Sequence, residues 1–180
     1  MAATLREFLP TIIFLAKFLG IYLLASLLYG AFVTAFEPGP DPATRAVAQQ
    51  TSTALGVLGW ETSTHDNASK PTTEVAYRKH DILSIYEGCN GINVMVIFAA
   101  FLLAFGPINS RLWWYIPFGL IVLHVSNMFR ITILFWVSLN QPDFMYFLHK
   151  YFFTAALYVV TFILWVIWVR MYMRTKVVKA

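Results

Sequence analysis

The feature that most constrains this chain is a set of long apolar runs that carry few charges. Residues 11–36 contain one charged side chain, Lys17, and residues 112–139 and 144–171 are also strongly apolar. A helix needs about 20 apolar residues to cross a bilayer, and a helix satisfies all its backbone polar groups within lipid. The sequence therefore predicts an all-α integral membrane protein.

A shorter apolar run over residues 90–106, ending at Pro107, completes a predicted bundle of four transmembrane helices. We expect the spans at about 11–36, 90–106, 112–139 and 144–171. Charged residues make up 12% of the chain, about half the share usual in soluble domains, and the length suits a single domain over residues 1–180. The basic residues lie at helix ends rather than in a patch with stacking aromatics, which argues against a nucleic-acid partner.

The one strongly polar segment, residues 37–88, separates the first two spans. The proline-rich residues 37–42 break the first helix. Asp41 followed by Pro42 predicts the start of a second helix over residues 43–60, which we expect to lie along the membrane surface. Residues 61–86 are rich in Thr and contain a turn-like stretch at 66–71, which predicts a β-hairpin.

Basic residues predict the orientation of the bundle. Arg111 lies in the short loop between the second and third spans, and the C-terminal end carries Arg170, Arg174, Lys176 and Lys179. The positive-inside rule places both in the cytoplasm. Four spans then put both termini inside, with residues 37–88 and the turn at 140–143 on the extracytoplasmic side of the inner (plasma) membrane.

Residues 86–92, Tyr-Glu-Gly-Cys-Asn-Gly-Ile, stand where the polar segment meets the second span. Cys89 is the single cysteine of the chain, which excludes an intramolecular disulfide, a CxxC motif and a Cys-rich metal site. No ligand cluster has metal spacing, so neither a metal nor a cofactor is predicted. Gly88 and Gly91 allow tight turns around the thiol. Cys89 is a nucleophile candidate if a base and a charge stabiliser can reach it.

Two further residues converge on the same leaflet. His149 lies near the outer start of the fourth span, and Arg130 lies inside the third, where a charge is a functional-site hypothesis by default. Asn127 precedes Arg130 by one helical turn and could orient its guanidinium. Counted from the outer end of its span, Arg130 is about 13 Å deep, so we expect it to snorkel outward to meet Cys89. A thiolate, a cationic donor and a histidine together can perform acyl transfer.

These residues resemble the exosortase/archaeosortase family of polytopic membrane cysteine transpeptidases. The family pattern is a Cys-x-Gly at a helix start, an Asn-x-x-Arg in a later helix and a His that opens the next one. Here these are Cys89 to Gly91, Asn127 to Arg130, and His149. The resemblance covers residues 87–162 and is nearest to compact forms such as the type F branch. Many members have Ser where this chain has Asn90.

The resemblance implies a role for each matched residue. Cys89 would be the nucleophile, Arg130 the partner of the oxyanion or thiolate, and His149 the proton shuttle. The supporting positions are Asn127, Glu87, Asn90 and Gly91.

The resemblance also implies the substrates and the product. Substrates would be membrane-anchored proteins with a C-terminal sorting signal, made of a short motif, a transmembrane helix and a basic tail. Cleavage at the outer face would leave a thioester, and a surface acceptor would take the product. No cofactor is implied, and small membrane accessory proteins are candidate partners.

The sequence is also compatible with a function that involves no catalysis. The chain could be a non-catalytic membrane scaffold or carrier that binds an anion through Arg130 and Asn127, or a haem between His124 and His149. His124 is deeper than Arg130 and mainly on another face, which favours a packing role. His65 and His80 lie in the polar segment, where His80 with Asp81 is a conceivable base. An accessible thiolate would favour the peptidase over the scaffold, because a scaffold does not need one.

Overall fold

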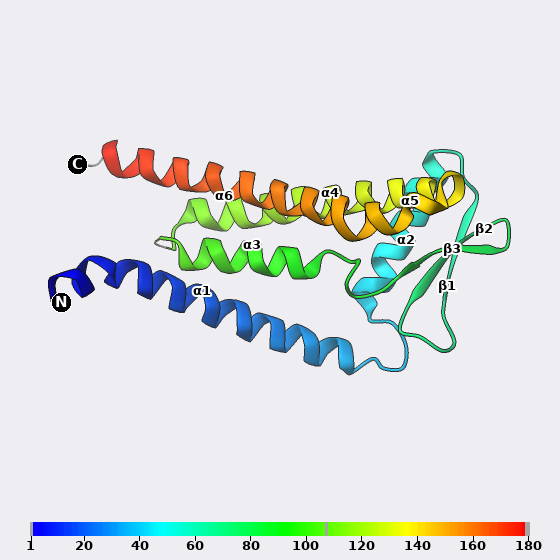
Figure 1. Cartoon of the computed structure of the whole chain (residues 1–180), viewed down its shortest axis with the longest axis horizontal. Helices are drawn as coiled ribbons and strands as arrows, with labels where there is room; N and C mark the ends of the chain where they lie inside the picture. Colours follow the sequence, from blue (N-terminus) through cyan, green and yellow to red (C-terminus); the bar gives the residue numbers. More distant parts are fainter. Residues whose placement is uncertain (1, 107, 179–180) are drawn as a thin grey trace.

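A computed structural model describes residues 2–106 and 108–178, with side chains described over 7–106 and 108–173. The long helices α1 (Ala2–Thr34), α4 (Ser110–Asn140) and α6 (Phe153–Val178) run side by side with the shorter α3 (Ile92–Ala104) (Figure 1). A small sheet and α2 (Pro42–Val57) lie at one end of the molecule, called the sheet end below. The opposite end, with the α3–α4 turn and the end of α6, is the tail end.

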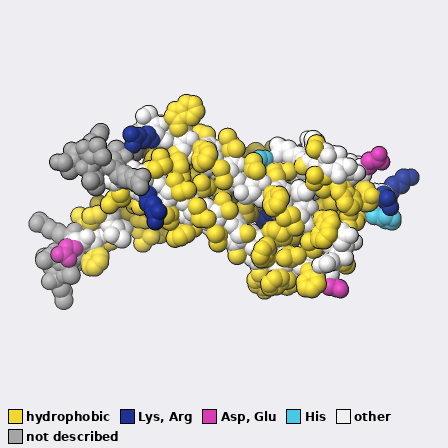
Figure 2. All heavy atoms as spheres, turned by 90° about the horizontal axis from the view of Figure 1, so that it is seen from above, with side chains coloured by type: hydrophobic (Ala, Val, Ile, Leu, Met, Phe, Trp, Pro, Cys, Tyr) yellow, Lys and Arg dark blue, Asp and Glu magenta, His cyan; other side chains and the backbone are white. Residues whose placement is uncertain are grey.

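Within the described residues, three helical segments are long and apolar enough to span a membrane: Glu7–Thr34, Ser110–Asn140 and Pro142–Met173. Figure 2 shows hydrophobic side chains over most of one face, with charged side chains mainly towards the two ends. Large side chains such as Leu27, Trp114 and Phe129 are each more than 65% exposed, which is unfavourable in water but normal against lipid. The chain is thus a mostly helical, membrane-embedded protein.

The run expected as the second span forms a helix of only 13 residues, α3. It extends about 20 Å and is shorter than the roughly 20 residues that a full crossing needs, so a fourth helix of membrane length is not observed among the residues that the structure describes. Pro107, expected to end this span, lies outside the described residues. α3 packs tightly on α4, where a Cβ at Gly119 would lie 2.1 Å from the ring of Phe98.

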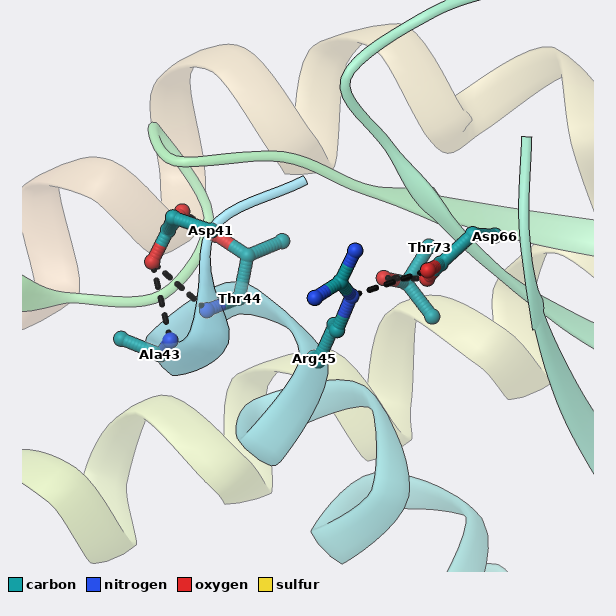
Figure 3. A network of polar contacts seen from close by, with 6 residues as sticks. All are labelled: Asp41, Ala43, Thr44, Arg45, Asp66 and Thr73. Atoms are coloured by element: carbon teal, nitrogen blue, oxygen red, sulfur yellow. Dashed lines mark hydrogen bonds and ion pairs between the residues drawn. The ribbon is translucent and has the colours of Figure 1, made fainter. Parts of the chain in front are cut away.

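The start of α2 follows the sequence expectation. The Asp41 carboxylate accepts hydrogen bonds from the backbone N–H groups of Ala43 and Thr44 at 2.9 and 3.1 Å (Figure 3). The same figure shows Arg45 of α2 paired with Asp66 of the sheet at 2.8 Å.

The expected position of α2 along the membrane surface stays a prediction, and the structure adds that this helix has a packed face. One of its faces is buried and packs against the sheet and α4. This packed face combines small polar and apolar residues; the buried residues of α2 are Thr44, Val47, Ala48, Thr51 and Leu55.

The polar segment forms three antiparallel strands in the order β1 (Thr62–Asp66), β2 (Thr73–Tyr77) and β3 (His80–Ile85), where a single hairpin was expected. The turn between β2 and β3 consists of Arg78 and Lys79, both with positive φ. Two-residue hairpin turns of this kind usually carry Gly or Asn, so their sequence signal is missing here. β3 leads directly into the loop that holds Cys89.

Candidate active site

The loop between β3 and α3 positions Cys89. The Cys89 N–H donates to the Tyr86 carbonyl oxygen at 2.8 Å, which closes a tight turn. The Tyr86 ring covers Gly88 so closely that a Cβ there would lie 2.3 Å from a ring carbon. Gly91 has φ +82°, a left-handed conformation that glycine adopts without strain, and α3 starts at the next residue. Glycine is therefore favoured at position 88 by the close Tyr86 ring and at position 91 by the positive φ.

His149 lies against the thiol. Its Nε2 is 3.5 Å from the Cys89 Sγ, although 60 residues separate the two in sequence. His149 belongs to a single π-helical turn, Leu148–Phe152, between α5 (Pro142–Phe147) and α6. Such turns inside α-helices are frequently found at functional sites, and this one carries the imidazole. The pair is close enough for proton transfer between sulfur and nitrogen.

Asn127 and Arg130 approach the same loop from α4. The Asn127 side chain is fully buried, and its Nδ2 donates to the Cys89 carbonyl oxygen at 2.9 Å. Arg130, 7% exposed, donates from Nη1 to the Asn127 Oδ1 at 3.4 Å. The spacing of three residues puts both side chains on one helix face. A chain of contacts thus runs from the guanidinium through Asn127 to the backbone of the nucleophile candidate.

The depth of the site differs from the expectation. Asn127 lies 17 residues into α4, or about 26 Å from Ser110 along the axis, and the loop of Cys89 meets α4 at this level. Arg130 therefore does not snorkel toward the outer end of α4. Its guanidinium points back toward Asn127. The reason is that α3 is short, so the Cys89 loop at its start meets α4 well before the sheet end of α4.

The Arg130 Nε–H is the least satisfied polar group of the site. It is buried and meets no hydrogen-bond acceptor among the residues the structure describes. Leaving such a donor unpaired costs about 1–3 kcal/mol, and more for a charged group. Neighbouring atoms cover this donor, so a ligand oxygen reaches it only when the side chains around it move.

Electrostatics keep the thiol protonated at rest. Burial raises the pKa of Cys89 above its usual value, and the negative charge of Glu87 acts in the same direction. Hydrogen bonding with Tyr86 and the positive charge of Arg130 lower the pKa but do not outweigh burial. A base is therefore needed to form the thiolate.

Asn90 forms its hydrogen bonds with residues outside the Cys89–His149 pair. Its Nδ2 donates to the Tyr29 hydroxyl at 2.6 Å and to the Thr44 Oγ1 at 3.3 Å, and its Oδ1 accepts from the Ile92 N–H. Asn90 thus ties α1, α2 and the start of α3 together beside Cys89. Sequence reasoning missed Tyr29 and Thr44. The only available signal was a phenol near the end of an apolar run.

The remaining polar candidates, apart from Glu87, lie away from the thiol. Glu87 is partly buried next to the thiol. His124 hydrogen-bonds to Gln50 of α2 at 2.7 Å, and His65 pairs with Asp81 across the sheet at 3.4 Å, both half exposed. Among the described residues, no group of three or more His, Cys, Asp or Glu side chains could hold a metal ion.

Comparisons with known protein families, with curated proteins and with solved structures find no match to this chain. The interpretation of the site accordingly rests on its geometry.

Proposed function

We propose that this chain is a membrane-embedded cysteine peptidase that transfers the acyl part of its substrate to an acceptor, as a transpeptidase of the exosortase type does. The observation that carries the proposal is the 3.5 Å separation of the Cys89 Sγ and the His149 Nε2, beside the buried, unpaired Nε–H of Arg130. A nucleophile with an adjacent base and a cationic donor is the minimum set for acyl transfer.

The first half-reaction forms a thioester. The His149 Nε2 takes the proton from the Cys89 Sγ, and the thiolate attacks the carbonyl carbon of the scissile peptide bond. The oxyanion that develops accepts hydrogen bonds from Arg130, including its free Nε–H. The tetrahedral intermediate then loses the amine, which takes the proton from His149 as the C–N bond breaks.

The second half-reaction releases the product. An acceptor amine, or water, gives a proton to His149 and attacks the thioester carbonyl, and the sulfur leaves as the thiolate, which takes the proton back from the imidazolium. Asn127 acts here as a positioning residue, because it contacts both the Cys89 backbone and the Arg130 guanidinium.

The surroundings of His149 support a substrate that is held in the membrane. The nearby aromatic side chains are more than half exposed, as in a membrane-interface belt; they are Phe144, Tyr146, Phe147, Tyr151 and Phe152. We infer that the scissile bond lies near the outer edge of the hydrocarbon core, between a short recognition motif and the substrate's own transmembrane helix.

The proposed topology places the sheet end outside the inner membrane. Arg111 and Arg170 at the tail end support a cytoplasmic location for that end by the positive-inside rule. α3 would serve as a short fourth membrane element whose outer end carries the nucleophile loop. The acceptor would be an amine of a surface glycan or lipid.

A second candidate function uses residues of the same site for binding instead of catalysis. Arg130 and Asn127 would bind an anion in a non-catalytic carrier, an idea favoured by the unpaired Nε–H alone. In that case the thiol is incidental and its proximity to His149 has no consequence.

The test is co-expression with a membrane-anchored substrate that ends in a transmembrane helix and a basic tail. We expect Cys89→Ala and His149→Ala to abolish processing while the protein stays folded in detergent. His124→Ala is the matched control, because it removes a membrane-level histidine that contacts Gln50 instead of the thiol. Processing by Cys89→Ala in cells without related enzymes would refute the nucleophile assignment and favour the anion carrier.

Substitution of the arginine tests the oxyanion role separately. Arg130→Lys keeps the charge but loses the planar set of donors. We therefore expect a loss of processing of about 100-fold or more, typical of a removed oxyanion donor.

A further inference from the structure

An open groove of about 630 Å³ lies at the tail end, far from the site of Cys89. One wall comes from the first half of α1, another from the end of α3, and Tyr172 of α6 completes it. The groove exists because α3 ends at Ala104 while α1 continues past it. The walls are mainly apolar, with side chains such as Ile13, Phe14 and Phe105.

Among the residues with described side chains that line the groove, Lys17 alone is charged. It follows Phe14 by three residues on the same face of α1, and the Phe14 ring packs on Phe105 of α3 at 5.9 Å. Lys17 is about 15 Å along α1 from Glu7, so its ammonium lies within a segment of membrane length. A charge at such a depth is costly unless it finds a partner or reaches the interface.

No hydrogen bond or ion pair is formed by the Lys17 ammonium within the part of the chain that the structure describes. The C-terminal end of α3 in the same groove supplies about half a negative charge from its carbonyl groups. Much of the ammonium charge is therefore not compensated. A ligand that compensates it has to carry a negative charge together with apolar groups that contact the walls.

We propose that this groove binds an anionic glycerophospholipid, with its phosphate at Lys17 and an acyl chain along α1 and α3. The apolar walls disfavour a free phosphate ion, which would lose its hydration there without compensation. The positive charge disfavours the basic tail of a protein substrate. With the orientation proposed above, the groove opens to the cytoplasmic leaflet, where anionic lipids are enriched.

Native mass spectrometry of the full chain in detergent tests this, with phosphatidylglycerol and phosphatidylcholine of the same acyl chains as probes. We expect tighter binding of phosphatidylglycerol. Lys17→Ala should reduce that binding about five-fold, the effect of one basic residue near a membrane surface. Lys17→Arg should retain it, and the control Lys150→Ala, which removes a cation at the sheet end, should leave it unchanged.

Two further measurements locate the site. Thr11→Trp places a large ring in the groove without changing charge, so it should weaken both lipids. An excess of inorganic phosphate should not displace phosphatidylglycerol; displacement would instead indicate a simple phosphate site and overturn the proposal. Equal binding of the two lipids, or an unchanged affinity in Lys17→Ala or Thr11→Trp, would also overturn it. None of these readouts depends on catalysis.

Discussion

Replacement of Gly91 by alanine tests how the nucleophile loop is held. Gly91 has φ +82°, and a Cβ there would lie 3.1 Å from the side chain of Asn127. Gly59, in the turn after α2, has φ +87° but nothing within 4 Å of the same position. The pair Gly91→Ala and Gly59→Ala therefore shares the backbone strain and differs in the contact with Asn127.

The expected magnitudes follow from these two terms. A left-handed conformation costs a residue other than glycine about 1–2 kcal/mol, so Gly59→Ala should lose about that much stability. In Gly91→Ala the displaced Asn127 also weakens its 2.9 Å hydrogen bond to the Cys89 carbonyl. Such a bond is worth about 0.5–1.5 kcal/mol, for a total of about 1.5–3.5 kcal/mol.

Two assays separate the effect of the backbone strain from the effect of the weakened Asn127 hydrogen bond. Reversible unfolding in mixed detergent measures the free-energy difference, and iodoacetamide labelling reports on Cys89 alone, because it is the single thiol of the chain. Labelling should become faster in Gly91→Ala, since the wild-type thiol is only 6% exposed, and stay at the wild-type rate in Gly59→Ala. Equal losses of stability with equal labelling rates would show that Asn127 does not hold the loop.

Two predictions concern pH. Because burial raises the pKa of Cys89, the folded protein keeps this proton above about pH 8.5, where the unfolded chain loses it; stability should fall as the pH rises from there, and Cys89→Ala should remove that slope in an unfolding titration. Burial alone would raise the pKa of Glu74, but hydrogen bonds from Ser84, Thr72 and Asn67 outweigh it and hold the pKa below its usual value. Its contribution is present above about pH 4.3 and is lost as the pH falls through the lower folded value, so Glu74→Gln should flatten the acid limb of a stability–pH curve; an unchanged limb would contradict the assignment.

The sequence allowed a good prediction of the long helices and a poor one of how the parts meet. Asp41 and Pro42 marked the start of α2 because capping depends on residues within one helical turn. The third strand was missed because Arg78 and Lys79 adopt positive φ without the residues that usually signal it. The packed face of α2 was not predicted, because it depends on partners in the sheet and α4.

What the sequence determined by itself is the membrane class and the residues worth testing. The apolar runs predict membrane spans, because about 20 consecutive apolar residues are enough for one helix to cross a bilayer with its backbone hydrogen bonds satisfied. Arg130 stood out for the same reason, as a charge inside such a run.

Only the tertiary structure decided the depth of the Cys89 loop, the contact of His149 with the thiol, and the use of Asn90 to join Tyr29 and Thr44. These depend on how a 13-residue helix packs beside helices twice its length. That packing is a property of contacts between distant segments, which no local pattern encodes.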